Sequence, residues 1–293
     1  MNISCSARKN WQYHIRDWLD FQRSFAKIHS NFEFDYDDID YAFGSVEGIT
    51  SLYGGRIASD LNLTKVDVYW LYDHNIGVKL PLSTKIFNDD VYKESSKFLQ
   101  YYHRKGNAII TSSDKLAKRI KEDFPEYKLE ASCIQDIVTP DKLKKKISLG
   151  VYDTIVLPIH MNDDIKFLKK IKDKKQIRLF LNVECSYTCP KKVCYNLTSK
   201  INAGEEENKF KCSFWNLGLE RTFYNDDINW SEYYFDKSKF DKMGFSKYKL
   251  VPPWESQQRT FIMYEKNKSL GGASGDVQVG IGISNPMFYI KML

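Results

Sequence analysis

The sequence lacks any long apolar segment. No apolar run in its 293 residues approaches the roughly 18 that a membrane-spanning helix needs. Residues 1–19 are polar and aromatic and contain no apolar signal-peptide core. The six cysteines are too few for a secreted disulfide scaffold in a chain of this length. These absences predict a cytoplasmic protein that does not associate with a membrane.

A glycine-rich fingerprint for a dinucleotide or a phosphate is also missing after every predicted strand. What the chain does contain, from about Phe34 onward, is a series of short apolar runs that alternate with helical patterns. This alternation indicates a parallel sheet covered on both faces. Eight such units would close into a (β/α)8 TIM-like barrel, whose reactive end lies at the carboxyl ends of the strands. The alternative is an open doubly wound parallel sheet, which the missing fingerprint disfavours.

The pattern divides the chain into three parts. Residues 1–33 carry apolar side chains near helical spacing and are predicted to form an N-terminal helical extension. Residues 34–260 are predicted to form the barrel, and the glycine-rich residues 261–293 an irregular C-terminal tail. The barrel strands are predicted at 41–45, 78–83, 107–111, 128–133, 154–159, 177–182, 210–215 and 248–251.

The charge balance is mildly basic. Lysines and arginines number 44 against 38 acidic residues, for a formal net charge of +6. Much of the surplus lies in local lysine runs, which are typical of solvated helix faces. The alternative is a basic surface that meets RNA or an acidic ligand. The substrate or partner is therefore expected to be a small molecule or an RNA, and the sequence does not fix the oligomeric state.

Closely spaced cysteines are the most informative feature. Cys185, Cys189 and Cys194 follow the strand predicted at 177–182, and Cys212 comes on or just before the next strand. Thiolates in one loop can turn toward one point, and a fourth from a neighbouring strand completes a tetrahedron. The four cysteines are predicted to bind a four-iron four-sulfur (4Fe-4S) cluster or, alternatively, zinc, because their spacing does not separate the two. The plain alternative is that these cysteines are small buried hydrophobes or unliganded thiols.

Other candidate residues lie at the predicted strand ends. His160 closes the strand at 154–159, where a barrel enzyme would hold a general base. Glu184 and Asn182 flank the cysteine loop and are predicted as a proton acceptor and a substrate-binding amide. Arg56 follows two glycines, where it could bind a carboxylate or phosphate. The competing interpretations are a surface histidine, a solvent-facing acid and a structural salt bridge.

Two stretches resemble a known family. Residues 182–190 read Asn-x-x-Cys-x-x-x-Cys-Pro after a strand, and residues 244–251 read Gly-Phe-Ser-Lys-Tyr-Lys-Leu-Val. Both resemble the collagenase-like peptidase family of α/β barrels, which includes iron–sulfur proteins that act in tRNA and ubiquinone hydroxylation. Residues 42–45 and 54–56 are similar to a divergent branch of these barrels. The resemblance implies an oxygen-independent hydroxylation or a related redox role.

Three functions follow as hypotheses. The first is an iron–sulfur barrel enzyme that modifies a small molecule or an RNA nucleotide. The second is an accessory barrel in which structural zinc ties the loop to the next strand and the basic surface binds a partner. The third is a metal-free lyase or hydrolase that uses His160 and Glu184. No Ser-His-Asp or Cys-His order stands out, so the sequence does not indicate a protease.

Overall fold

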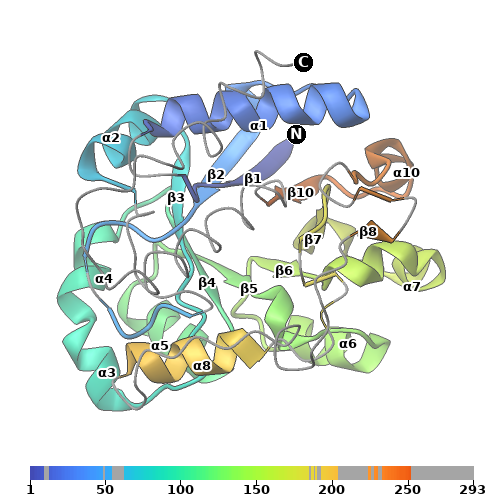
Figure 1. Ribbon diagram of the computed structural model, residues 1–293. Helices are drawn as coiled ribbons and strands as arrows, with labels where there is room; N and C mark the ends of the chain where they lie inside the picture. Colours follow the sequence, from blue (N-terminus) through green and yellow to red (C-terminus); the bar gives the residue numbers. More distant parts are fainter. Residues whose placement is uncertain are drawn as a thin grey trace.

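The chain forms a closed barrel of eight parallel strands (Figure 1). The computed structural model describes residues 1–9, 13–48, 50–54, 63–184, 186–187, 189, 193–203, 224–225, 228–229 and 233–251. Around the barrel the strand order is β1-β10-β7-β6-β5-β4-β3-β2. The predicted barrel is thereby confirmed, and the open doubly wound alternative is wrong. The barrel strands are β1 (Asn2–Ser6), β2 (Ile39–Phe43), β3 (Gly77–Leu80), β4 (Ala108–Thr111), β5 (Lys128–Ala131), β6 (Thr154–Val156), β7 (Ile177–Phe180) and β10 (Lys247–Leu250).

The barrel closes through a strand that the sequence analysis missed. β1 pairs in parallel with β10 on one side and with β2 on the other. It lies within residues 1–33, which were predicted as a helical extension outside the barrel; that prediction is wrong for β1, whereas α1 (Ile15–Ser30) is helical. Ile3 and Cys5 are buried on one face of β1, whereas Ser4 and Ser6 are buried on the other. Serines on the buried inner face gave this strand too weak an apolar signal. The strand predicted at 210–215 lies outside the described residues.

Helices surround the strands (Figure 1). Thr64 and Ser113 cap the helices that follow them, because their hydroxyls accept the backbone N–H groups of Asp67 and Leu116. Within the described part of the chain, no helix is long and apolar enough to cross a membrane. The α-helices are α1 (Ile15–Ser30), α2 (Lys65–Asp73), α3 (Asp89–Glu94), α4 (Ser96–Tyr102), α5 (Asp114–Asp123), α6 (Pro140–Ser148), α7 (Ile165–Lys170), α8 (Val193–Asn202) and α10 (Lys237–Lys242). A two-stranded antiparallel sheet is formed by β8 (Tyr224–Asn225) and β9 (Ile228–Asn229).

The polar residue that interrupts the apolar stripe of α1 has a structural partner. Gln22 is buried, and its Nε2 donates to the carbonyl oxygen of Ser6 at 2.8 Å. The Nε1 of Trp18 donates to the same carbonyl at 2.7 Å. Both bonds satisfy the backbone carbonyl at the end of β1. Gln22 therefore fixes α1 against the barrel strand that precedes it.

A buried ion pair connects α1, α2 and the segment after β1. Lys9 Nζ lies 3.0 Å from Asp67 Oδ2, and the two side chains are 1% and 2% exposed. Asp67 Oδ1 also accepts the backbone N–H of Ile15 at 2.8 Å. We expect Asp67→Asn to lower the free energy of unfolding by about 2–3 kcal/mol, because Lys9 then stays buried without a counter-charge. Urea unfolding measures this, with the exposed Asp73→Asn on the same helix as the unaffected control. Equal effects of the two substitutions would contradict the role of Asp67 as the buried counter-charge of Lys9.

Candidate functional site

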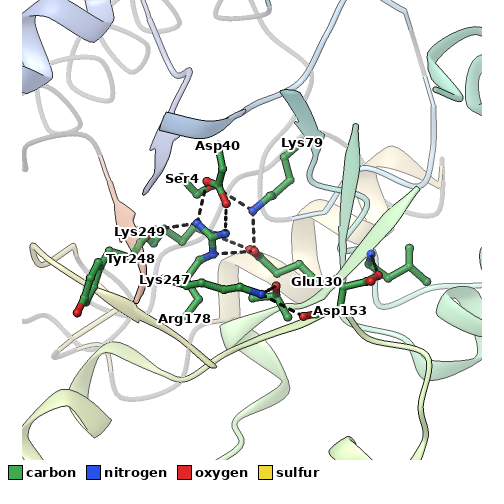
Figure 2. A network of polar contacts seen from close by, with 11 residues as sticks. Ser4, Asp40, Lys79, Glu130, Asp153, Arg178, Lys247, Tyr248 and Lys249 are labelled. Atoms are coloured by element: carbon green, nitrogen blue, oxygen red, sulfur yellow. Dashed lines mark hydrogen bonds and ion pairs between the residues drawn. The ribbon is translucent and has the colours of Figure 1, made fainter. Parts of the chain in front are cut away.

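The interior of the barrel is charged. Such interiors are usually filled by branched apolar side chains. Here four strands each direct one charged residue inward, and Figure 2 shows these side chains converging. The side chains are almost fully buried, with exposed fractions of 1 to 7%. These four residues are Lys79 of β3, Glu130 of β5, Arg178 of β7 and Lys249 of β10. Together with Asp40 of β2 they form what we call the interior cluster.

One carboxylate stands at the centre of the interior cluster. Lys79 Nζ donates to Glu130 Oε2 at 2.6 Å and to Ser4 Oγ at 3.2 Å. Arg178 Nε lies 3.2 Å from the same Glu130 oxygen. Lys249 Nζ lies 3.5 Å from the other oxygen, Oε1. Glu130 therefore balances three cations that come from three different strands.

A β-bulge brings the second carboxylate into the cluster. Ile3 pairs with Ile39 and Ser4 with Tyr41, so Asp40 is an extra residue on β2. Its carboxylate accepts from Arg178 Nη1 at 3.2 Å and Nη2 at 2.5 Å. Such a two-pronged contact is among the strongest that a guanidinium makes. Arg178 thus joins both carboxylates of the cluster.

The charges of the interior cluster do not cancel. While Lys79 is protonated, three cations face two carboxylates, and one positive charge is in excess. Burial first, and the charge of Arg178 second, lower the pKa of Lys79 to about 7, although Glu130 attracts the ammonium. Burial alone would raise the pKa of Glu130, but the attraction of Lys79 and the other two cations lowers it to about 2. Near neutral pH a large share of the molecules therefore holds Lys79 as a neutral amine, and Glu130 stays ionised.

Aromatic rings line the cations. Lys79 Nζ lies 4.1 Å from the centroid of the Tyr41 ring, and Lys249 Nζ lies 4.3 Å from that of Phe43. The electron-rich ring faces attract cations and exclude water from them. Burial first, and then the charge of Asp40, raise the pKa of Tyr41 to about 12. The phenol is therefore neutral at physiological pH and adds no charge to the cluster.

The cysteine loop lies at the carboxyl end of the barrel. Cys189 lies between β7 and α8, and Cys194 lies in the first turn of α8. Cys185 and Cys212 lie outside the described residues. Within the described ranges, no three His, Cys, Asp or Glu side chains are grouped so that they could hold a metal. The four-cysteine site therefore stays a prediction.

The helix after this loop is joined to loops from other strands. Ser199 Oγ of α8 accepts the backbone N–H of Lys85 at 3.0 Å, in the loop after β3. Asn202 Nδ2 donates to the carbonyl oxygen of Tyr53 at 2.8 Å, in the loop after β2. In the closed order, β2 and β3 lie opposite β7. The second half of α8 therefore contacts the loops at the carboxyl ends of β2 and β3.

The other predicted site residues lie apart from the interior cluster. His160 is exposed on the short 3-10 helix η3 (Ile159–Asp163), and Glu184 accepts from Ser186 Oγ at 2.8 Å. The amide of Asn182 exchanges two hydrogen bonds with the backbone of Val251, at 2.8 and 2.9 Å, and so joins the ends of β7 and β10. Arg56 lies outside the described residues. In the described part of the chain, no hydrogen bond joins His160, Glu184 or Asn182 to the cluster.

The sequence analysis missed the members of the interior cluster. Each of its four strands has one charged residue between apolar neighbours, as in Leu129-Glu130-Ala131. A charge at this position of a strand buried on both faces would need a partner across the barrel. The sequence signal for the interior cluster was therefore three basic residues and one acidic residue, each within an otherwise apolar strand.

The comparisons with known proteins show the fold. No protein-family model matches the chain, and no curated protein matches its sequence. Among solved structures, the chain is similar to "The Structure of the U32 Peptidase Mk0906", with a TM-score of 0.55 and 12% sequence identity. The match covers 86% of this chain and 92% of that one. In its fold, the chain is therefore similar to a U32 peptidase, of the collagenase-like family that its sequence motifs resemble.

Proposed function

We propose that the protein is a barrel enzyme whose reactive group is the side-chain amine of Lys79, acting on a small carbonyl compound that bears an anionic group. The contact between Lys79 and Glu130, inside a cluster with one excess cation, carries this proposal. Buried charges of this kind contribute little net stability, because desolvation offsets their attraction. Clusters of perturbed titratable groups are instead typical of functional sites.

The chemistry follows from a neutral amine beside an ionised acid. A buried lysine that loses its proton near neutral pH is a nucleophile for carbonyl carbons. Its nitrogen forms a bond to the carbonyl carbon, and the carbonyl oxygen leaves as water, which yields an imine without change of oxidation state. The two hydrogens of the neutral amine leave with that oxygen as water, while the ionised Glu130 Oε2, 2.6 Å from the nitrogen, holds the amine in place. Lys249 and Arg178 supply positive charge for a carboxylate on the substrate. This is the chemistry of a metal-free lyase.

Reductive trapping tests this proposal. We expect glyoxylate with cyanoborohydride at pH 7 to modify Lys79 faster than the exposed Lys144, because a large share of Lys79 is neutral at that pH, whereas a lysine with an ordinary pKa is protonated. Cyanoborohydride donates the hydride that converts the imine to a stable secondary amine. Peptide mass spectrometry locates and quantifies the label, and Lys79→Met provides the blank. An unmodified Lys79 beside a modified Lys144 would exclude the proposal.

A second candidate function rests on the cysteine loop. Cys189 and Cys194 lie at the carboxyl end, where barrel enzymes carry their reactive groups. With Cys185 and Cys212 they would supply four thiolates, which suit a four-iron four-sulfur cluster or zinc. When bound, such a cluster supplies one-electron chemistry for hydroxylation or a related redox change of a small molecule or an RNA nucleotide. Zinc instead would support an accessory barrel that binds a partner.

Metal analysis of protein prepared without oxygen tests this second candidate. This candidate predicts iron and acid-labile sulfide in the wild type, and loss of both in Cys189→Ala and in Cys194→Ala. Cys133→Ala, which lies at the end of β5, is the matched control and should keep its iron. Stoichiometric zinc would favour the accessory barrel. Protein that contains neither metal would refute the cysteine site and leave the proposal for Lys79 untouched.

A further inference from the structure

A separate cavity opens at the amino-terminal end of the barrel strands. Its volume is about 540 Å³, within the range of small-molecule sites. It lies at the opposite end of the strands from the cysteine loop. Its wall is formed by residues at or just before strand starts, among them Gly77, Asn107, Lys128, Thr154 and Lys247. We call this cavity the amino-end pocket.

The amino-end pocket has an excess of positive charge. Five cationic and two acidic side chains line it. Both carboxylates are already paired: Asp153 accepts from Lys128 Nζ at 3.0 Å, and Asp40 is held by Arg178. Among the described residues, no carboxylate forms an ion pair with the remaining cations. These unpaired cations of the pocket are Arg104, Lys105 and Lys247.

Lys247 is the most informative of these cations. It is half-buried, and its Nζ donates to neutral oxygens, Thr154 Oγ1 at 3.0 Å and the carbonyl of Asp153 at 3.3 Å. Figure 2 shows it beside the interior cluster. Burial first, and the positive charge of Arg178 second, lower the pKa of Lys247. A half-buried cation without an ion-pair partner costs free energy, which an anionic ligand would recover.

An arginine at the edge of the pocket is held by stacking. The guanidinium of Arg104 lies 3.9 Å from the centroid of the Tyr72 ring, and both residues line the pocket. Stacking on a ring leaves the N–H groups at the edge of the guanidinium available. These groups match two oxygens of a phosphate. Arg104 thus offers paired N–H donors, and Lys247 an ammonium group, to the same cavity.

We propose that the amino-end pocket binds a small ligand through a phosphate group, with Lys247 and Arg104 as its main contacts. A phosphate carries enough negative charge to compensate two of the unpaired cations. The pocket is too small to enclose a macromolecule and has the volume of a metabolite site. Asp40 and Arg178 of the interior cluster also line the pocket, but its proposed contacts, Lys247 and Arg104, take no part in the proposed reaction. The phosphate site therefore goes beyond that reaction.

Calorimetric titration with pyrophosphate tests the proposal on the full chain at constant ionic strength. We expect binding to the wild type with a dissociation constant below about 1 mM. Lys247→Gln and Arg104→Gln should each raise that constant at least about tenfold, because each removes one charged contact. The exposed Lys144→Gln, which leaves the pocket intact, should not change it.

Two outcomes would overturn the proposal. One is the absence of pyrophosphate binding to folded wild-type protein. The other is equal weakening by Lys144→Gln, which would indicate general attraction to a basic chain. Arg104 is exposed, so its variant is expected to fold even if the half-buried Lys247 variant does not. The readout needs no turnover and leaves Lys79 unchanged, which keeps failure here distinct from failure of the proposed reaction.

Discussion

Replacing Glu130 by Gln is expected to lower the free energy of unfolding by about 3–5 kcal/mol. Glu130 is 2% exposed and contacts Lys79, Arg178 and Lys249. The amide has nearly the same shape but carries no charge, so the three cations keep only Asp40 as a counter-ion. Breaking a buried ion pair from one side leaves uncompensated charge, which costs far more than the pair contributes when intact.

Urea unfolding measures this effect, and two further variants control it. Glu126→Gln changes an exposed acid in the turn before the same strand and should shift stability by no more than about 0.5 kcal/mol. Adding Lys79→Met to Glu130→Gln removes one of the stranded cations and should restore part of the loss. A loss of similar size from Glu126→Gln, or no recovery in the double variant, would contradict the central place of Glu130.

The same carboxylate gives the protein an acid-sensitive component. The pKa of Glu130 is about 2 in the folded chain and 4.5 ordinarily. A carboxyl whose pKa is depressed on folding stabilises the fold fully above its unfolded value. We therefore expect this contribution to decline as the pH falls from about 4.5 to about 2. Below pH 4.5, the free energy of unfolding should fall less steeply with decreasing pH in Glu130→Gln than in the wild type. Parallel curves for the two proteins would contradict this contribution of Glu130.

Much of the barrel could be predicted because most of its strands are short runs of largely apolar residues. The run Ala108–Thr111 and its counterparts stand out against the polar helices that separate them. β1 did not stand out in the sequence, because three of its five residues are Asn or Ser. Its membership of the barrel depends on pairing with β10, about 245 residues further along the chain. No local pattern contains that information.

The interior cluster could be predicted only in part, for a related reason. A charge within each of four apolar runs is visible in the sequence, but the convergence of these charges is not. Lys79 and Glu130 are 51 residues apart, and Lys249 and Glu130 are 119 apart. Asp40 joins them only because of a bulge that shifts the register of β2 against β1. Conversely, the spacing of the cysteines is local, which is why sequence reasoning found them first.

Replacing Lys79 by Met is expected to make the protein at least as stable at pH 7 while abolishing the trapping reaction with glyoxylate. The folded pKa of about 7 lies below the ordinary value of 10.5, so between these values the unfolded chain binds a proton that the folded chain does not. The wild type should therefore gain about 1.4 kcal/mol of stability per pH unit from Lys79 as the pH rises from 7 toward 9.5. Above that window the buried phenol of Tyr41, with its raised pKa, begins to oppose the gain.

In Lys79→Met this rise with pH should be missing, whereas Lys144→Met should run parallel to the wild type. Urea unfolding at several pH values between 7 and 9.5 measures the slopes. A lysine kept only to hold the barrel together would instead lose stability on replacement, because its contact with Glu130 would then be worth more than its desolvation costs. A gain in stability with a loss of reactivity identifies a group retained for function. The charged and titratable groups that set this balance around Lys79 are Glu130, Arg178, Lys249, Asp40 and Tyr41.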